Sequence, residues 1–218
     1  MNLLPVDVLP ELLPPRGYVA PDELHPPGGR SGAAREARLA PARADHRALT
    51  RDLIARGVAE ALAGRHAAAL AALDEAARSL EHADDPARLL LMLNRAQALL
   101  ETDDLAAADE VAADALRLAR REREDRWIAL ASLSAALVHL ARGRRAEARS
   151  RLGAAVRQLA RDGDALRQIQ CHYLLGEIAY IAEDPIRAGS HYRDALGVAR
   201  AAHQQEWIDL LTLRFEHR

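Results

Sequence analysis

Small and apolar residues recur along the chain at offsets that repeat every 39 or 40 residues, starting at positions 64, 103, 143 and 183. The first set is Gly64, Ala69, Leu73 and Ala76, and its last three members are spaced to share one helix face. The later sets are Asp103, Ala108, Ala112 and Ala115; Gly143, Ala148, Leu152 and Ala155; and Glu183, Ala188, Tyr192 and Ala195. Seven residues before each set stands a small residue: Gly57, Ala96, Ala136 and Gly176. The pattern predicts a repeated structural unit.

Each unit is expected to be a helix, a short turn and a second helix. Small side chains let paired helices approach closely, and the larger residue usual at the third offset fills the remaining gap. Turn signals within pairs are Gly64-Arg65, Asp103-Asp104, Gly143 and Asp184-Pro185. Those between pairs are Asp84-Asp85-Pro86, Glu124-Asp125 and Asp162-Gly163-Asp164. With aromatic residues at 3% and strand formers scarce, we expect an all-α protein with a core of alanine and leucine.

Proline divides the chain into two regions. Eight of the ten prolines lie in residues 1–41, where they prevent long helices. We therefore expect a Pro/Gly-rich, disordered arm over residues 1–45 and a helical domain over 46–218. The expected repeats are 48–84, 86–123, 125–162 and 164–202, followed by a terminal helix over 204–218. Pro86 and Pro185 each follow an aspartate, which is typical of a helix start.

The repeat resembles the tetratricopeptide family over residues 48–202. The matching residues are Gly57, Gly64, Ala69, Leu73 and Ala76 in the first unit and Gly176, Ala188, Tyr192 and Ala195 in the fourth. The period exceeds the family's ~34 residues and is similar to that of bacterial regulators of the maltose-activator type and of kinesin light chains. The resemblance implies a right-handed α-solenoid that binds peptides, proteins or small regulatory ligands and is rarely an enzyme.

The resemblance also implies which side chains line the concave groove of such a solenoid. Carried over by register, the groove residues are Ile54, Val58, Leu93, Asn94, Gln97, Leu100, Leu133, Leu137, Leu140, Tyr173, Glu177 and Tyr180. This mostly apolar surface suits an amphipathic helix or an apolar peptide. The family's clamp for a carboxylate-terminated chaperone tail needs basic and amide residues at positions where only Asn94 fits, so that partner is rejected.

Two segments of the chain are further candidates for contact. Residues 3–15 carry spaced leucine and valine between prolines, and we hypothesise that they dock in the groove as a pseudo-ligand of the same or a neighbouring chain. The alternative is a disordered tail. The terminal segment carries the apolar residues Trp207, Leu210, Leu211 and Phe215. They are expected to pack on the fourth pair, with a homo-oligomeric or partner contact as the alternative.

Charge is unevenly distributed although the formal net charge is only −2. Residues 81–116 carry nine acids and two arginines, and residues 141–161 carry seven arginines and Glu147. The candidate basic surface is formed by Arg144, Arg145, Arg149 and Arg151. A solvated helix face explains these arginines, and the alternative is contact with an acidic protein or nucleic acid. The small net charge and the lack of interleaved aromatic residues argue against nucleic acid.

The sequence contains no recognised motif for catalysis or for cofactor binding. There is no HExxH, no glycine-rich phosphate loop and no GxSxG, and no histidine pairs at i, i+4 with another ligand. Cys171, the single cysteine, is expected to be a small core residue in a reducing compartment. No stretch approaches ~18 uninterrupted apolar residues, so no membrane span is expected. We therefore predict a cytoplasmic, bacterial, non-catalytic protein without metal or cofactor.

Two functions remain open from the sequence. The first is a protein-interaction scaffold that holds an apolar or amphipathic segment in its concave groove. The second is a ligand-responsive regulatory domain of a bacterial transcription or signalling system. Because no DNA-binding segment is recognised in the chain, the second role would be exercised through a separate DNA-binding chain.

Overall fold

The computed structural model describes residues 18–19, 41–79 and 85–216 of the chain. These residues form helices and turns without any strand, which confirms the all-α expectation for this part of the protein. The helices are α2 (Pro41–Leu62), α3 (His66–Arg78), α4 (Asp85–Glu101), α5 (Leu105–Glu122), α6 (Asp125–Ala141), α7 (Arg145–Asp162), α8 (Ala165–Ile181), α9 (Pro185–Ala201) and α10 (Gln205–Glu216).

The described helices group into two compact units. The first unit contains Tyr18, Val19 and helices α2 to α5, and the second unit contains α6 to α10. Helix α2 begins at Pro41, inside the range expected for the N-terminal arm. Most of that arm, including the hypothesised docking segment 3–15, lies outside the described residues.

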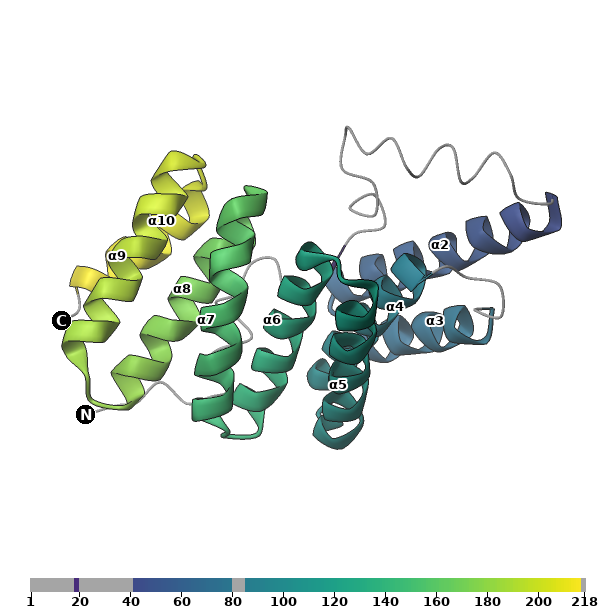
Figure 1. The fold of residues 1–218 in the computed structure, drawn as a ribbon, viewed down its shortest axis with the longest axis horizontal. Coiled ribbons are helices and arrows are strands. Elements are labelled where there is room, and N and C mark those ends of the chain that lie inside the picture. Colours follow the sequence, from purple (N-terminus) through teal and green to yellow (C-terminus); the bar gives the residue numbers. More distant parts are fainter. Residues whose placement is uncertain (1–17, 20–40, 80–84, 217–218) are drawn as a thin grey trace. The chain divides into compact units, whose positions relative to one another are not determined.

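Within each unit, helices that are consecutive in sequence pack against one another (Figure 1). In the first unit α2 pairs with α3 and α4 pairs with α5, and α4 also contacts both α2 and α3. In the second unit each helix from α6 to α10 contacts the next. Helix α10 therefore packs on the last helical pair, as one reading of its apolar residues predicted, and its Trp207 is buried.

The recurrent small residues lie in the core where paired helices approach closely. The second, third and fourth members of every set are buried. A Cβ atom on Gly57 would lie 2.8 Å from Cγ of Leu73, and one on Gly176 would lie 2.6 Å from Cε1 of Tyr192. The larger residue at the third offset thus fills the space over the glycine of the preceding helix, as the sequence pattern predicted.

The turns share one backbone geometry. Apart from the segment between α3 and α4, most of which is outside the described residues, each turn between helices contains a residue with left-handed φ between 55° and 76°. From residue 103 onward these residues stand twenty positions apart. They are Gly64, Asp103, Arg123, Gly143, Gly163, Glu183 and His203. In the turn before α7 the amide of Arg144 donates to the carbonyl of His139 over 2.8 Å, which satisfies an orphan carbonyl of α6.

Two aspartates cap the helices that follow these turns. The side chain of Asp164 accepts from the amide of Arg167 at the start of α8, and that of Asp184 accepts from the amide of Arg187 at the start of α9. Pro185 occupies the first turn of α9, where the missing amide proton costs no helical hydrogen bond. Among the described helices, none combines the length and apolar character needed to cross a membrane.

Candidate functional site

A buried carboxamide on α4 binds the backbone of a residue far away in the sequence. The amide of Val19 donates to Oδ1 of Asn94 over 2.7 Å, and Nδ2 of Asn94 donates to the carbonyl of Val19 over 2.9 Å. The two residues are separated by 75 positions. Asn94 is 0% exposed and Val19 is 2% exposed, so both hydrogen bonds are shielded from water.

Both hydrogen bonds are made to the backbone of Val19 and neither to its side chain. One residue presents its own N–H and C=O to a single partner when its backbone is extended, as in an antiparallel strand pair. The Asn94 carboxamide, with an acceptor oxygen and a donor nitrogen, reproduces the missing neighbour strand. Recognition of this kind tolerates many side chains in the bound segment, because the contacting atoms are common to every residue except proline.

The local sequence explains why the carboxamide needs such a partner. Asn94 follows Leu93 in a helix whose preceding residues Leu89, Leu90 and Leu91 are all buried. A buried amide without hydrogen bonds costs about 1–3 kcal/mol, so an asparagine placed there is tolerated when another polar group meets it. The backbone of Val19 supplies that group, and Tyr18 beside it is also buried.

The other first-unit residues predicted for the groove lie on α2 and α4, which contact one another. Ile54 and Val58 of α2 and Leu93 and Gln97 of α4 are buried, and Leu100 is half-buried. Nε2 of Gln97 donates to Oε1 of Glu101 over 2.8 Å, so this carboxamide is directed along its own helix. Of the two amides predicted on α4, Asn94 thus contacts a segment from outside the helical pair.

The second-unit residues predicted for the groove differ in exposure. On α6, Leu133 is buried and Leu137 and Leu140 are half-buried. On α8, Tyr173 and Glu177 are buried, whereas Tyr180 is 41% exposed. The Tyr173 ring lies 6.0 Å from that of Tyr192 and 5.6 Å from that of Trp207, measured between centroids.

Glu177 is held inside the same helical pair. Its carboxylate accepts a hydrogen bond from the hydroxyl of Tyr192 on α9, in a buried position. Tyr192 is also the residue that packs over Gly176, so its side chain makes two of the contacts between α8 and α9. The structure therefore places Tyr173 and Glu177 among α8, α9 and α10 and leaves Tyr180 accessible.

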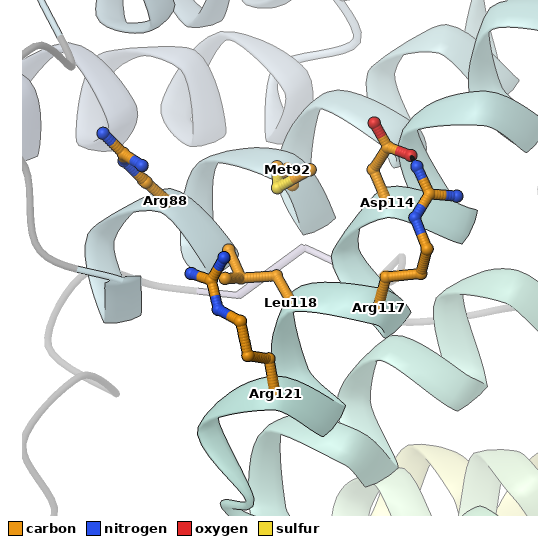
Figure 2. A pocket seen from close by; sticks show the side chains of 6 residues that line it. All are labelled: Arg88, Met92, Asp114, Arg117, Leu118 and Arg121. Atoms are coloured by element: carbon orange, nitrogen blue, oxygen red, sulfur yellow. Dashed lines mark hydrogen bonds and ion pairs between the residues drawn. The ribbon is translucent and has the colours of Figure 1, made fainter.

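A hollow of about 380 Å³ lies between α4 and α5 in the first unit. Figure 2 shows Arg88 and Met92 reaching it from α4, and Asp114, Arg117, Leu118 and Arg121 from α5. Arg117 forms an ion pair with Asp114, and Nε of Arg121 lies 3.2 Å from a carboxylate oxygen of Glu122. The hollow is lined by two apolar side chains, one carboxylate and three guanidinium groups, two of which are paired with acids.

The predicted basic surface lies at and just before the start of α7. Arg145 and Arg149 are exposed and stand one helical turn apart, while Arg144 and Arg151 are half-buried. Arg145 and Arg149 therefore present two positive charges on one face.

Three side chains that no sequence motif indicated meet on α8 and α9. His172 lies on α8, and His191 and Asp194 lie on α9 at i and i+3, with ligand atoms all within 4.8 Å of one another. The search for i, i+4 pairs passed over this spacing, although i, i+3 also places two residues on one helix face. The neighbouring Cys171 is buried, and burial raises the pKa of its thiol, so it stays a protonated core residue as predicted.

No protein-family model matches the chain, and no curated protein sequence matches it either. Any functional statement about it consequently depends on its residues and their geometry.

Proposed function

We propose that the chain is a non-catalytic interaction scaffold whose first unit binds a peptide segment through its backbone. In this proposal the helical pairs form a right-handed, tetratricopeptide-like α-solenoid, and the bound segment is apolar or amphipathic. The recurrence of 39 or 40 residues and the close approach at Gly57 and Gly176 support the solenoid.

The observation that carries the proposal is the pair of hydrogen bonds between Asn94 and Val19. A segment of the chain itself serves as the example of a bound peptide. The buried apolar residues Ile54, Val58 and Leu93 on the same two helices agree with an apolar bound segment. Leu137, Leu140 and Tyr180 are the predicted groove residues of the second unit that remain partly or largely accessible.

The proposal can be tested in the full chain with its own segment as the probe. The substitution Val19→Pro removes the amide that donates to Asn94 and should loosen the internal segment. A fluorescein-labelled peptide of residues 14–24 (PPRGYVAPDEL) is then titrated and followed by fluorescence anisotropy. We expect it to bind the Val19→Pro chain more tightly than the wild-type chain, because the internal competitor is weakened.

Variants of chain and peptide identify the contact. Adding Asn94→Ala should weaken peptide binding by about fivefold to 150-fold, since each of the two lost hydrogen bonds contributes about 0.5–1.5 kcal/mol. Methylation of the peptide nitrogen at the valine should have a similar effect, whereas exchanging that valine for isoleucine should not. Gln158→Ala, which removes an exposed carboxamide paired with Asp162, is the matched control. Equal binding to the chains with and without Asn94 would disprove the proposal.

The hollow on α4 and α5 favours a second candidate function, a ligand-responsive regulatory domain that acts through a separate DNA-binding chain. Its three guanidinium groups and the apolar side chains of Met92 and Leu118 suit a small organic anion. Citrate and nucleoside phosphates can be screened for a rise in melting temperature of the wild-type chain and of Arg88→Gln. A rise that Arg88→Gln abolishes would support this function, and no rise with any of them would remove its support.

A further inference from the structure

His172, His191 and Asp194 form a compact group on one helical pair of the second unit. Their candidate ligand atoms lie within 4.8 Å of one another. Nδ1 of His172 is 3.8 Å from Oδ2 of Asp194, and the two imidazole centroids are 6.0 Å apart. No other group of three or more His, Cys, Asp or Glu side chains with this spacing occurs in the part of the chain that the structure describes.

The packing of α8 against α9 fixes this arrangement. Tyr192 fits over Gly176 and so sets the register of the two helices, while its neighbour His191 lies beside His172. Asp194 follows His191 by three positions, which places both on one face of α9. The group is therefore positioned by the same contacts that hold the helical pair together.

The surroundings of both imidazoles disfavour the protonated form. Burial lowers the pKa of both His172 and His191. Asp194 opposes the change in both cases, whereas the charge of His191 adds to it for His172 and that of Arg187 adds to it for His191. Nδ1 of each ring is buried and, within the described residues, has no hydrogen-bond partner.

We infer that His172, His191 and Asp194 bind a divalent transition-metal ion of the Zn²⁺ class. Two imidazoles and one carboxylate are typical ligands for such ions and are poor ligands for Mg²⁺ or Ca²⁺, which prefer oxygen alone. Ligand atoms around a tetrahedral Zn²⁺ lie about 3.4 Å apart, so the three side chains close in slightly on binding. Asp194 is exposed over 52% of its side chain and is able to make that movement.

The number of ligands suggests what the ion does. Three protein ligands leave a fourth position for water or for a donor atom of a partner. The ion joins α8 to α9 and should stabilise the second unit by an amount that grows with the logarithm of the metal concentration divided by its dissociation constant. A metal site of this kind adds a ligand-dependent element to the second unit that does not depend on the peptide site at Asn94.

The test is equilibrium dialysis of the full, tag-free chain against ZnCl₂, with MgCl₂ as a second arm. We expect one Zn²⁺ per chain and a rise in the melting temperature of the second unit, with no binding of Mg²⁺ at the same concentrations. Trp127 and Trp207 are the two tryptophans of the chain and both lie in the second unit, so their fluorescence follows this transition. Co²⁺ should give the visible absorption of a four- or five-coordinate site.

Variants decide whether these three residues are the ligands. His191→Ala and Asp194→Asn should each weaken Zn²⁺ binding at least tenfold while leaving the helical circular dichroism of the metal-free chain unchanged. His203→Asn removes an exposed histidine of the same unit at φ 55°, a conformation that asparagine tolerates, and should bind as the wild type does. Wild-type affinity in His191→Ala, or equal loss in His203→Asn, would overturn the inference.

Discussion

The same position of the repeat holds a polar residue in helix α4 and an apolar residue in helix α8. Counted from the small residues Ala96 and Gly176 of the repeat, the position two residues earlier holds Asn94 in α4 and Leu174 in α8. Both side chains are buried, at 0% and 1% exposure. In the first unit the buried amide meets the backbone of Val19, and in the second the leucine lies in an apolar core.

The difference shows that a buried position shared by two helices of the repeat can be filled by a polar or by an apolar side chain. Asn94 pairs with the backbone of Val19, whereas Leu174 has no hydrogen-bonding group in its side chain to offer. In the second unit the core beside Leu174 is packed by side chains of the unit's own helices, because Trp207 of α10 lies against Tyr173 of α8. In the first unit, by contrast, the buried carboxamide of Asn94 needs a hydrogen-bonding partner, and the backbone of Val19 provides it.

Exchanging the two residues should give the largest effect. Leu174→Asn removes a buried leucine and introduces an amide without a designed partner, which should destabilise the second unit by about 3–5 kcal/mol. Urea unfolding followed by tryptophan fluorescence measures this loss. Asn94→Leu is the reciprocal change and should leave that transition unchanged, while hydrogen exchange at the Val19 amide becomes faster. A similar fluorescence-detected loss in both variants would contradict the comparison.

A smaller effect is expected from the two glycines at the helix contacts. Gly176→Ala places a methyl group against the ring of Tyr192, which cannot bend away, and should destabilise by about 2 kcal/mol despite the better helix propensity of alanine. Gly57→Ala meets Cγ and Cδ2 of Leu73, a side chain that changes rotamer more readily than a tyrosine ring, and should cost less, about 1 kcal/mol. Thermal unfolding by circular dichroism compares them, with Gly153→Ala in open helix space as the control. The reverse order would show that the ring relocates easily.

The smallest effect concerns pH and the second unit. The pKa of His172 and of His191 is lowered by burial, so the unfolded chain takes up protons near pH 6.5 before the folded chain does. Stability of the second unit should therefore fall as the pH decreases below about 6.5. Urea unfolding at pH 7.5 and 5.5, with a chelator present, measures how the free energy of unfolding changes with pH. This change should be smaller in the double variant His172→Gln/His191→Gln. If the pH dependence of the unfolding free energy is unchanged in that variant, it comes from other titratable groups.

The sequence was sufficient to predict the helical character and the turns, because both follow from local residue preferences. Gly64, Gly143 and Gly163 stand at left-handed turn positions, and Asp164 and Asp184 cap the helices after them. Close packing at Gly57 and Gly176 was also predictable, since a small residue faced a larger one in a recurring register.

The candidate sites were less predictable because each depends on residues distant in sequence. Asn94 stood among the predicted groove residues, but nothing near it indicated that Val19 would be its partner. The proposed metal ligands required the register of α8 on α9, which brings His172 beside His191. Tyr173 looked like a groove residue from its helix position, and its burial against Trp207 depends on how α10 packs.

Because Val19 belongs to the same chain as Asn94, dilution of the protein does not weaken their contact. A tethered segment acts at an effective concentration on the order of millimolar, whatever the amount of protein in the cell. An outside peptide with the same intrinsic affinity would have to approach that concentration to take half of the sites. In the proposed function, a partner must therefore bind more tightly than the internal segment, and weak or transient competitors would be excluded.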